Sequence, residues 1–353
     1  MYSGTVIRDE DQWQGHPDVA LFKNKIYIVY RQSDEHMTHG PTSINLVTGS
    51  IINREGESPY LSYISFPKTI AASLHRLNCP RLTVIGDALW MICDEVQSMR
   101  EGDTKGYFAA EDDPNLTRVF LWKTIDGDHW DGPFHTNITG ILPDKILPAE
   151  GGYCIATHTG VKVKNTPRRR LAQNLWFTKD LENGNFVRYQ IASDSRYHLC
   201  EASLFKYNNR YCCLMRENSG KGLPAFLSIS KDCKEWEGLI RTRMFGCHRP
   251  VAGILKSGKI LITYRENVHP HIHPLWARNT FAYLAQYTIK DEKIDVSKGV
   301  ILPIDHDNNK IRSDSGYTGW VQLQDESIFI VNYLTGDAPT PYIKWYLIRE
   351  EDF

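Results

Sequence analysis

The chain has 353 residues and a formal net charge of −1. This balance leaves no global basic surface, so nucleic acid is excluded as an expected partner. No apolar stretch reaches the roughly 20 residues that span a bilayer, so we expect no membrane partner, and the first residues lack the basic start and apolar centre of a secretion signal. We expect a cytoplasmic or virion-associated protein, or a secreted one if a signal has been trimmed.

Cysteine and histidine usage predicts neither a metal nor a cofactor. The eight cysteines stand singly or as the pair Cys212 and Cys213, often inside apolar runs and without Cys-x-x-Cys spacing, which is typical of reduced core residues. His269, His271 and His273 alternate and could form a metal tripod on an extended segment, but the interleaved prolines indicate a loop instead.

Short β-branched or aromatic runs bounded by Gly, Asn or Asp turns dominate the chain, and no helical apolar period persists for three turns. In chain order the predicted strands include KIYIVYR, RLTVIG, ALWMICD, RVFLWKT, NLWFT, RYCCLM, AFLSIS, KILITYR, FAYLAQYTI, SIFIVNYL and YIKWYLI. We expect long loops over about residues 32–75, 95–115, 158–172 and 266–277. No linker or composition step divides the chain, so we expect one all-β domain over residues 1–353.

A second pattern repeats along these runs, because six polar or charged residues each stand just before an apolar hairpin. The six are His16, Arg81, Glu150, Glu201, Arg249 and Tyr317. Five of their hairpins lead to a further charged or histidine side chain, namely Arg31, Asp94, His158, Arg216 and Arg265. The spacing, about 15 residues in three cases, fits two short strands and a turn, so both ends of a hairpin lie at one sheet edge. Radial packing of such units predicts a six-bladed β-propeller whose edges meet at one mouth.

The side chains expected at this mouth indicate an anionic ligand. Arg31, Arg216, Arg249 and Arg265 would converge there, and an arginine fork suits bidentate capture of a carboxylate. These residues therefore predict an anionic ligand and acid-base or nucleophilic chemistry at the mouth.

Three other side chains at the mouth suggest chemistry. Tyrosine is a poor nucleophile at its ordinary pKa of about 10, so Tyr317 would need Glu201 to take its proton. His16 is expected to bond a substrate hydroxyl or to carry a proton.

Two segments share another pattern, Thr124–Trp130 and Ser230–Trp236, and a looser third begins at Thr178. Each follows a strand run, so its hydroxyl and carboxylate can hold a tight turn by bonding backbone amides. We assign these segments a structural role.

These segments resemble the aspartate boxes of the sialidase superfamily, and with Ser313–Tyr317 leading into a strand run the resemblance covers most of the chain. The resemblance implies a six-bladed propeller with its active site at the axis. It also implies three arginines against a sugar carboxylate, a tyrosine nucleophile assisted by a glutamate, and an aspartate acid/base.

The family positions map onto particular residues of this chain. By this resemblance Tyr317 is the nucleophile, Glu201 its base and Arg216 the second arginine. The third arginine is either Arg278, which precedes the run NTFAYLAQY, or Arg265, which ends the preceding hairpin.

The first arginine of the family is absent, and His16 stands in its place. The match is therefore to a diverged sialidase-like branch. The acid/base position falls on Asp34, with Glu35 and His36 as competitors, and Asp314, beside Tyr317 in a Gly-flanked turn, is expected to bind substrate.

Three functions fit these residues. The leading hypothesis is an exo-acting glycoside hydrolase that removes a terminal acidic sugar. A polysaccharide lyase acting on uronate-containing glycan is an alternative in which His16, Tyr317 and Arg216 suffice. A non-catalytic glycan-binding propeller is the third, because a fold alone does not define an activity.

Overall fold

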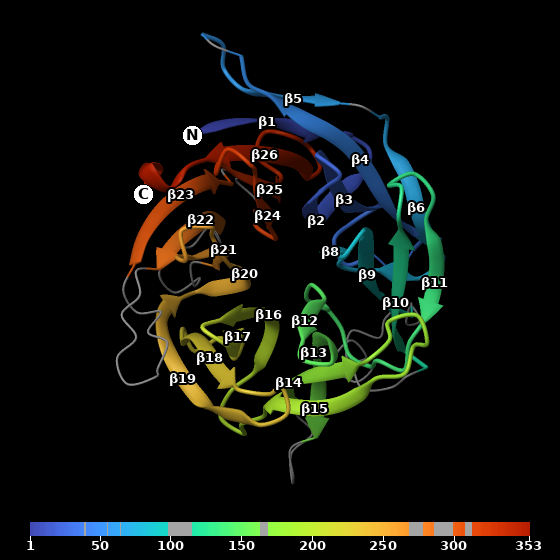
Figure 1. Cartoon of the computed structure of the whole chain (residues 1–353), viewed down its shortest axis with the longest axis vertical. Coiled ribbons are helices and arrows are strands. Elements are labelled where there is room, and N and C mark those ends of the chain that lie inside the picture. Colours follow the sequence, from blue (N-terminus) through green and yellow to red (C-terminus); the bar gives the residue numbers. More distant parts are fainter. Residues whose placement is uncertain are drawn as a thin grey trace.

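The computed structural model describes residues 1–38, 40–54, 56–63, 65–97, 115–162, 169–267, 278–285, 299–307 and 313–353. Within these ranges the strands form six antiparallel sheets, and Figure 1 shows them standing around one central axis. The predicted all-β, six-bladed β-propeller is confirmed. The histidines at 269, 271 and 273 lie outside the described residues.

Each sheet is one blade, and the strands nearest the axis in Figure 1 are β2, β8, β12, β16, β20 and β24. Blade 1 contains β2 (Trp13–Phe22), β3 (Lys25–Ser33), β4 (Thr42–Ile52), β5 (Tyr60–Tyr63) and β6 (Lys68–Ser73). Blade 2 contains β7 (Arg76–Leu77), β8 (Arg81–Ile85), β9 (Ala88–Val96), β10 (Thr117–Thr124) and β11 (Asp131–His135). Blade 3 contains β12 (Leu147–Ala149), β13 (Gly152–Lys162), β14 (Arg169–Thr178) and β15 (Val187–Ala192).

Blade 4 contains β16 (Leu199–Tyr207), β17 (Arg210–Glu217), β18 (Pro224–Ser230) and β19 (Trp236–Phe245). Blade 5 contains β20 (Cys247–Ile254), β21 (Ile260–Asn267), β22 (Arg278–Ala285) and β23 (Gly299–His306). Blade 6 combines β24 (Gly319–Gln322), β25 (Ile328–Leu334) and β26 (Tyr342–Ile348) with β1 (Tyr2–Ile7), and a short 3₁₀ helix, Glu350–Asp352, follows. Among the described residues no helix is long and apolar enough to cross a membrane.

The ring is closed by the N-terminal strand, which was not predicted. Strand β1 pairs antiparallel with β26 as the outermost strand of blade 6, and the chain then enters blade 1. At the inner edge of the same junction, a Cβ on Gly319 would lie 2.8 Å from Asp18 Cα and would also meet the Asp18 carboxylate. Blades 6 and 1 therefore approach too closely for any side chain at Gly319.

Side chains of the inner strands also tie neighbouring blades together. Asp18 accepts a hydrogen bond from the Leu82 amide at 2.7 Å, and Asp144 accepts one from the Leu204 amide at 2.6 Å. Arg81 lies between these two carboxylates, 3.4 Å from Asp18 and 3.5 Å from Asp144. A buried cation thus links the carboxylates that join blade 1 to blade 2 and blade 3 to blade 4.

Apolar side chains fill the space between blades. One cluster joins blades 1 and 6 through Val19, Ile28, Phe329 and Val331. All eight cysteines lie in described residues, and all are buried and free of disulfides, as predicted.

The expectation of a long loop over residues 32–75 is wrong, because β4, β5 and β6 lie within it. Polar side chains in this range bond one another between strands. Asn45 Nδ2 donates to Gln32 at 3.0 Å, and Thr69 donates to Asn45 at 2.8 Å. The expected loop at 158–172 is also partly strand, since β13 extends to 162 and β14 begins at 169.

The turns after β10 and β18 have the structural role expected of them. Thr124 Oγ1 accepts the Gly127 amide at 2.8 Å, while Asp126 Oδ1 accepts the amides of Asp128 and His129 at 2.8 Å each. The turn after β18 repeats this arrangement with its own serine and aspartate. These hydrogen bonds hold the two turns in shape.

Candidate functional site

A repeated irregularity of the inner strands aims single side chains out of the blades. His16, Glu201 and Arg249 have left-handed φ angles of 52°, 45° and 47°, and the pairing register of β2, β16 and β20 shifts at each. Such bulges turn one residue out of the pleat. All three side chains meet at Tyr317: His16 stacks on its ring, Glu201 bonds its hydroxyl, and Arg249 lies 6.0 Å from its ring centroid.

The prediction is wrong for two of the six residues expected at the mouth. Arg81 lies within β8 and forms the buried link between blades described above. Glu150 lies in the turn between β12 and β13, at the opposite end of that hairpin from His158. In blade 3 the residue with the same left-handed backbone is Leu142, whose φ is 52°. The sequence pattern did not identify this position because that pattern consists of polar or charged side chains.

Tyr317, Glu201 and Arg216 form a hydrogen-bonded chain. Tyr317 Oη donates to Glu201 Oε1 at 2.8 Å, and Arg216 Nη1 donates to the same oxygen at 2.6 Å. Tyr317 is 6% exposed and Glu201 5%. Glu201 and Arg216 belong to blade 4, whereas Tyr317 precedes the first strand of blade 6, so the contact crosses the ring. The prediction that separate hairpins bring these residues together is confirmed.

The surrounding charges decide which partner holds the proton. Burial alone would favour a neutral Glu201, but Arg216, followed by Arg265, holds the pKa of Glu201 well below its usual value. Burial and the Glu201 charge raise the pKa of Tyr317 above its usual value. At neutral pH, Glu201 is therefore an ionised acceptor and Tyr317 a protonated donor.

His16 presents one unprotonated nitrogen to this chain. Its ring stacks on Tyr317 with centroids 4.6 Å apart and 20° between planes. His16 Nδ1 lies 2.9 Å from the Asn78 carbonyl, which can only accept, so Nδ1 carries the hydrogen. Burial, followed by the Arg31 and His36 charges, holds the pKa of His16 well below its usual value, so the ring is neutral. Its Nε2 lone pair has no partner in the described part of the chain.

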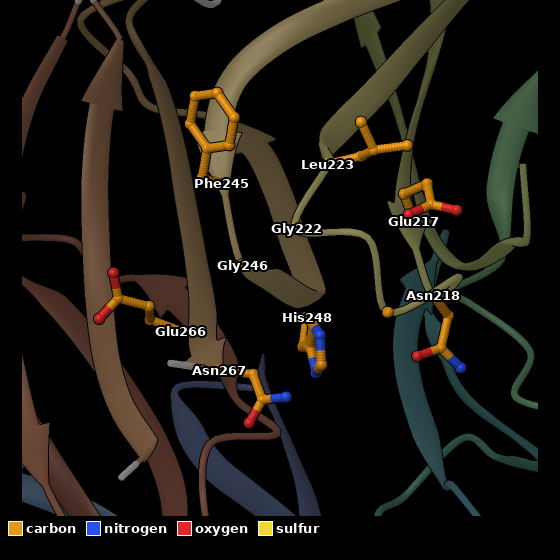
Figure 2. A pocket seen from close by; sticks show the side chains of 10 residues that line it. Glu217, Asn218, Gly222, Leu223, Phe245, Gly246, His248, Glu266 and Asn267 are labelled. Carbon is orange, nitrogen blue, oxygen red and sulfur yellow. The ribbon is translucent and has the colours of Figure 1, made fainter. Parts of the chain in front are cut away.

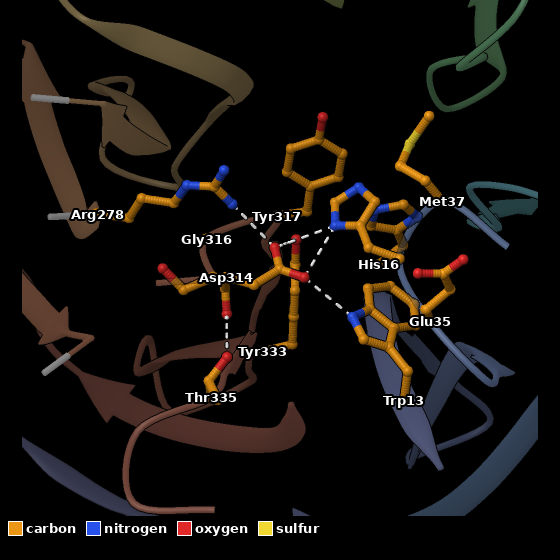
Figure 3. A network of polar contacts seen from close by, with 12 residues as sticks. Trp13, His16, Glu35, Met37, Arg278, Asp314, Gly316, Tyr317, Tyr333 and Thr335 are labelled. Atoms are coloured by element: carbon orange, nitrogen blue, oxygen red, sulfur yellow. Dashed lines mark hydrogen bonds and ion pairs between the residues drawn. The ribbon is translucent and has the colours of Figure 1, made fainter. Parts of the chain in front are cut away.

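Asp314 is the hub of a second network, drawn in Figure 3. Its carboxylate accepts from Trp13 Nε1, Arg278 Nη1 and Tyr333 Oη at 2.9 Å each, and His36 Nδ1 lies 2.9 Å from Oδ2. Burial opposes its charge, but His36 and Arg278 hold the pKa of Asp314 well below its usual value. Trp13 and Tyr333 were missed from the sequence. Tyr333 lies near the end of β25, as Arg31, Arg216 and Arg265 lie near the ends of other second strands, and this spacing could have identified it.

Both candidates for the third arginine lie beside the tyrosine. The Arg265 guanidinium lies 4.7 Å from the Tyr317 ring centroid, and its Nη1 donates to the Ser315 carbonyl at 3.1 Å. Arg278, from the next strand, is paired with Asp314 at 2.9 Å. Arg278 is thus neutralised by a carboxylate, whereas the described contacts of Arg265 include no acid.

Arg31 and Arg249 have different surroundings from those expected of ligand anchors. Arg31 Nη2 donates to the carbonyls of Glu35 at 3.2 Å and His36 at 2.5 Å, and its guanidinium stacks on Trp13 at 4.1 Å. Arg249 donates to the carbonyls of residues 142 and 143 at 3.3 and 2.9 Å. Arg31 Nη1 also donates to the Asn78 side chain at 3.3 Å, and Arg249 Nη2 donates to the Cys79 sulfur at 3.4 Å, so both guanidiniums bond groups of the protein itself.

Asp34 stands apart from the cluster. It is exposed, and its carboxylate accepts the amide of Glu35 at 2.8 Å. Two residues further on, His36 enters the Asp314 network. The structure therefore brings the competitor His36, and not Asp34, into contact with the other predicted side chains.

Several buried polar atoms around Tyr317 have no hydrogen-bond partner within the described residues. Buried polar atoms are nearly always satisfied in folded proteins, so a group of them marks a place where a ligand or water binds. The atoms are Arg216 Nε, Arg249 Nε, Arg265 Nε, Arg278 Nε, Glu201 Oε2 and His16 Nε2.

No protein-family model matches the chain, and no relative is found by sequence among curated proteins. Solved structures do match. A protein of unknown function from Dyadobacter fermentans aligns with a TM-score of 0.73 and 16% identity over 98% of this chain and 97% of that one. Trypanosoma rangeli sialidase in complex with sialic acid aligns with a TM-score of 0.60 and 10% identity over 96% of this chain and 55% of that one. The parainfluenza virus 5 hemagglutinin-neuraminidase ectodomain aligns with a TM-score of 0.59 and 11% identity over 97% and 82%.

At these identities the comparisons establish a shared fold. The chain has a β-propeller of the sialidase type, which supports the sequence resemblance at the level of architecture. It spans about half the length of the trypanosomal enzyme. Any activity must be argued from the side chains of this protein.

Proposed function

We propose that this protein is an exo-acting glycoside hydrolase that removes a terminal acidic sugar from a glycan. The supporting observation is the Tyr317–Glu201–Arg216 chain, in which a protonated phenol donates at 2.8 Å to a buried, ionised carboxylate. This arrangement has the nucleophile and base within hydrogen-bond reach, and the base is held by a third group.

In the proposed first step, the Tyr317 oxygen attacks the anomeric carbon as its proton passes to Glu201, and the bond to the leaving sugar breaks. An acid in the segment after β3 protonates that leaving oxygen. Asp34 remains the proposed acid because the resemblance places the acid/base there, and Glu35 and His36 are the competitors. In the second step water attacks the anomeric carbon and the bond from that carbon to the Tyr317 oxygen breaks. The residue that gave up its proton in the first step takes one from the water, and Glu201 returns its proton to Tyr317.

An acidic substrate would make Glu201 a stronger base than it is in the ligand-free protein. Arg216 and Arg265 hold the pKa of Glu201 low, which makes it a weak base. A substrate carboxylate bound at these arginines would offset their charge and raise the pKa of Glu201 as the proton must move. The unpartnered Nε atoms of Arg216, Arg265 and Arg278 are donors suited to such an anion.

A second candidate function is a polysaccharide lyase, and His16 favours it. Its neutral ring stacks on Tyr317 and leaves Nε2 without a partner in the described residues. Such a nitrogen can remove the C5 proton of a uronate whose carboxylate is held by the arginines.

The test is turnover of a panel of acidic glycosides and uronate-containing glycans by the parent protein and by Tyr317→Phe. Hydrolysis releases a reducing acidic sugar, whereas a lyase forms an unsaturated product that absorbs in the ultraviolet. We expect hydrolysis by the parent and a loss of at least about 100-fold in Tyr317→Phe. Tyr60→Phe, at a tyrosine 42% exposed on blade 1, should keep full activity. A parent inactive across the panel would favour binding alone.

A further inference from the structure

A cavity opens between blades 4 and 5, next to the cluster at the axis (Figure 2). Its volume is about 420 Å³, within the range of small-molecule sites. Its lining comes from the segment after β17, the start of β20 and the end of β21, which all belong to the mouth edge of their blades. The function proposed above leaves this cavity without a role.

Two residues connect the cavity directly to the central arginines. Asn218 lines it, and Asn218 Oδ1 accepts from Arg216 Nη2 at 2.6 Å. His248 also lines it, and His248 Nδ1 lies 3.4 Å from Arg265 Nη2. A molecule in the cavity would therefore lie against side chains that contact the central arginines directly.

These same contacts orient two donors for a ligand. Because Asn218 Oδ1 is occupied by Arg216, the amide nitrogen remains as the free end of that side chain. A guanidinium only donates, so His248 Nδ1 accepts and Nε2 carries the hydrogen. Burial, followed by Arg216 and Arg265, holds the pKa of His248 well below its usual value, so the ring stays neutral.

Acceptors line the same cavity. Glu266 uses Oε2 to accept from Asn279 at 2.9 Å, and Asn267 Oδ1 is buried without a partner among the described residues. Donors and acceptors side by side match hydroxyl groups, which both donate and accept. A metal or ammonium cation would instead meet the donors of Asn218 and His248.

The charges and an aromatic ring at the cavity further restrict the class of ligand that fits it. Among the described residues that line the cavity, Glu217 and Glu266 are acids and none is lysine or arginine. Glu217 is held by the protein, accepting the amides of His198 and Ser219 at 3.0 Å each. Phe245 lies at the cavity and is 59% exposed, which offers an apolar face of the kind that sugar rings cover.

We propose that this cavity binds a neutral sugar, the residue to which the terminal acidic sugar is linked. Phe245 stacks on its ring, and Asn218, His248, Glu266 and Asn267 bond its hydroxyls. The assignment as a leaving-group site rests on the function proposed above, whereas binding of a neutral sugar does not.

The test is ligand-observed NMR with methyl β-glucopyranoside and methyl β-galactopyranoside, each at up to tens of millimolar because one sugar ring binds weakly. We expect the parent and Tyr317→Phe to bind at least one of them equally. Phe245→Ala should weaken that binding at least fivefold. Phe66→Ala removes a ring that is 92% exposed on another blade and should change nothing.

Methyl β-glucuronide tests the charge, because it differs from the glucoside only by its carboxylate. Any binding of it at the arginines should be independent of Phe245. The cavity assignment fails if the parent binds neither neutral glycoside, or if Phe245→Ala leaves neutral binding unchanged.

Turnover separates this inference from the proposed hydrolase. Neutral binding that depends on Phe245 in a protein that cleaves nothing would support the cavity and contradict the hydrolase. Cleavage of an acidic–neutral disaccharide that needs Tyr317 but has the same KM in Phe245→Ala would support the hydrolase and contradict the cavity.

Discussion

Two ion pairs in this protein have the same length and different burial, which allows the energetics of the site to be measured. Arg216–Glu201 and Lys123–Glu182 are both 2.6 Å long, but the side chains are 11% and 6% exposed in the first pair and 27% and 50% in the second. Removing one partner of a buried pair leaves an uncompensated charge and costs about 3–5 kcal/mol. An exposed pair contributes about 0–1 kcal/mol.

We predict that Glu201→Gln lowers the free energy of unfolding at pH 7 by about 3 kcal/mol, at the low end because glutamine still fills the site. Glu182→Gln should lower it by less than about 1 kcal/mol. The assay is urea unfolding followed by circular dichroism, with the midpoints compared at constant slope.

The dependence on pH gives a second check. The folded-state pKa of Glu201 is depressed, so its stabilisation is present above the unfolded value of about 4.3 and is lost only as pH falls through the folded value. The gap between the parent and Glu201→Gln should therefore be the same at pH 7 and pH 5.

A double variant tests the cause. If the loss comes from the cation left behind, Glu201→Gln combined with Arg216→Met should recover at least half of it. Equal losses in Glu201→Gln and Glu182→Gln, or no recovery in the double variant, would refute the reasoning that the site is a dry, charge-coupled cluster.

Three further predictions concern the scaffold. Gly319→Ala should lower the free energy of unfolding by about 2–3 kcal/mol in a urea titration, because its Cβ would clash with Asp18 where blades 6 and 1 meet. An effect under about 0.5 kcal/mol would contradict that contact. Burial lowers the pKa of His158 to about 4, so the folded state loses stability as pH falls from 6.5 toward 4. His158→Gln should remove roughly 3 kcal/mol of this loss, measured as the difference between the free energies of unfolding at pH 7 and pH 4. The same pH dependence in parent and variant would be inconsistent with a buried neutral ring. Thr124→Val deletes the acceptor of the Gly127 amide and should cost about 1 kcal/mol by thermal unfolding, whereas no change would argue against the turn's structural role.

The hairpin spacing was sufficient to predict the blades and the central pair. Glu201 and Arg216 stand at the two ends of one hairpin, and a local spacing rule is enough to bring such ends to the same edge. The convergence of Tyr317 followed once the blades were arranged around an axis.

The remaining features depend on contacts that spacing does not encode. Asp314 bonds Trp13 across 301 positions of the chain, and β1 pairs with β26 from the other terminus. Leu142 takes the backbone of a mouth residue without a polar side chain to reveal it. Arg31 and Arg249 were expected at a ligand, and the bonds that they donate to backbone carbonyls could not be derived from the spacing either.

The most direct test of the central claim is covalent trapping at Tyr317. The parent protein is incubated with a fluorinated glycosyl fluoride of the acidic sugar that it cleaves, and its intact mass and peptides are measured. A retaining mechanism through tyrosine predicts a mass gain of one fluorinated sugar on the peptide containing Tyr317, and none in Tyr317→Phe. The account would be contradicted if the parent protein cleaves the unfluorinated glycoside but gains no adduct, or gains the adduct on another residue.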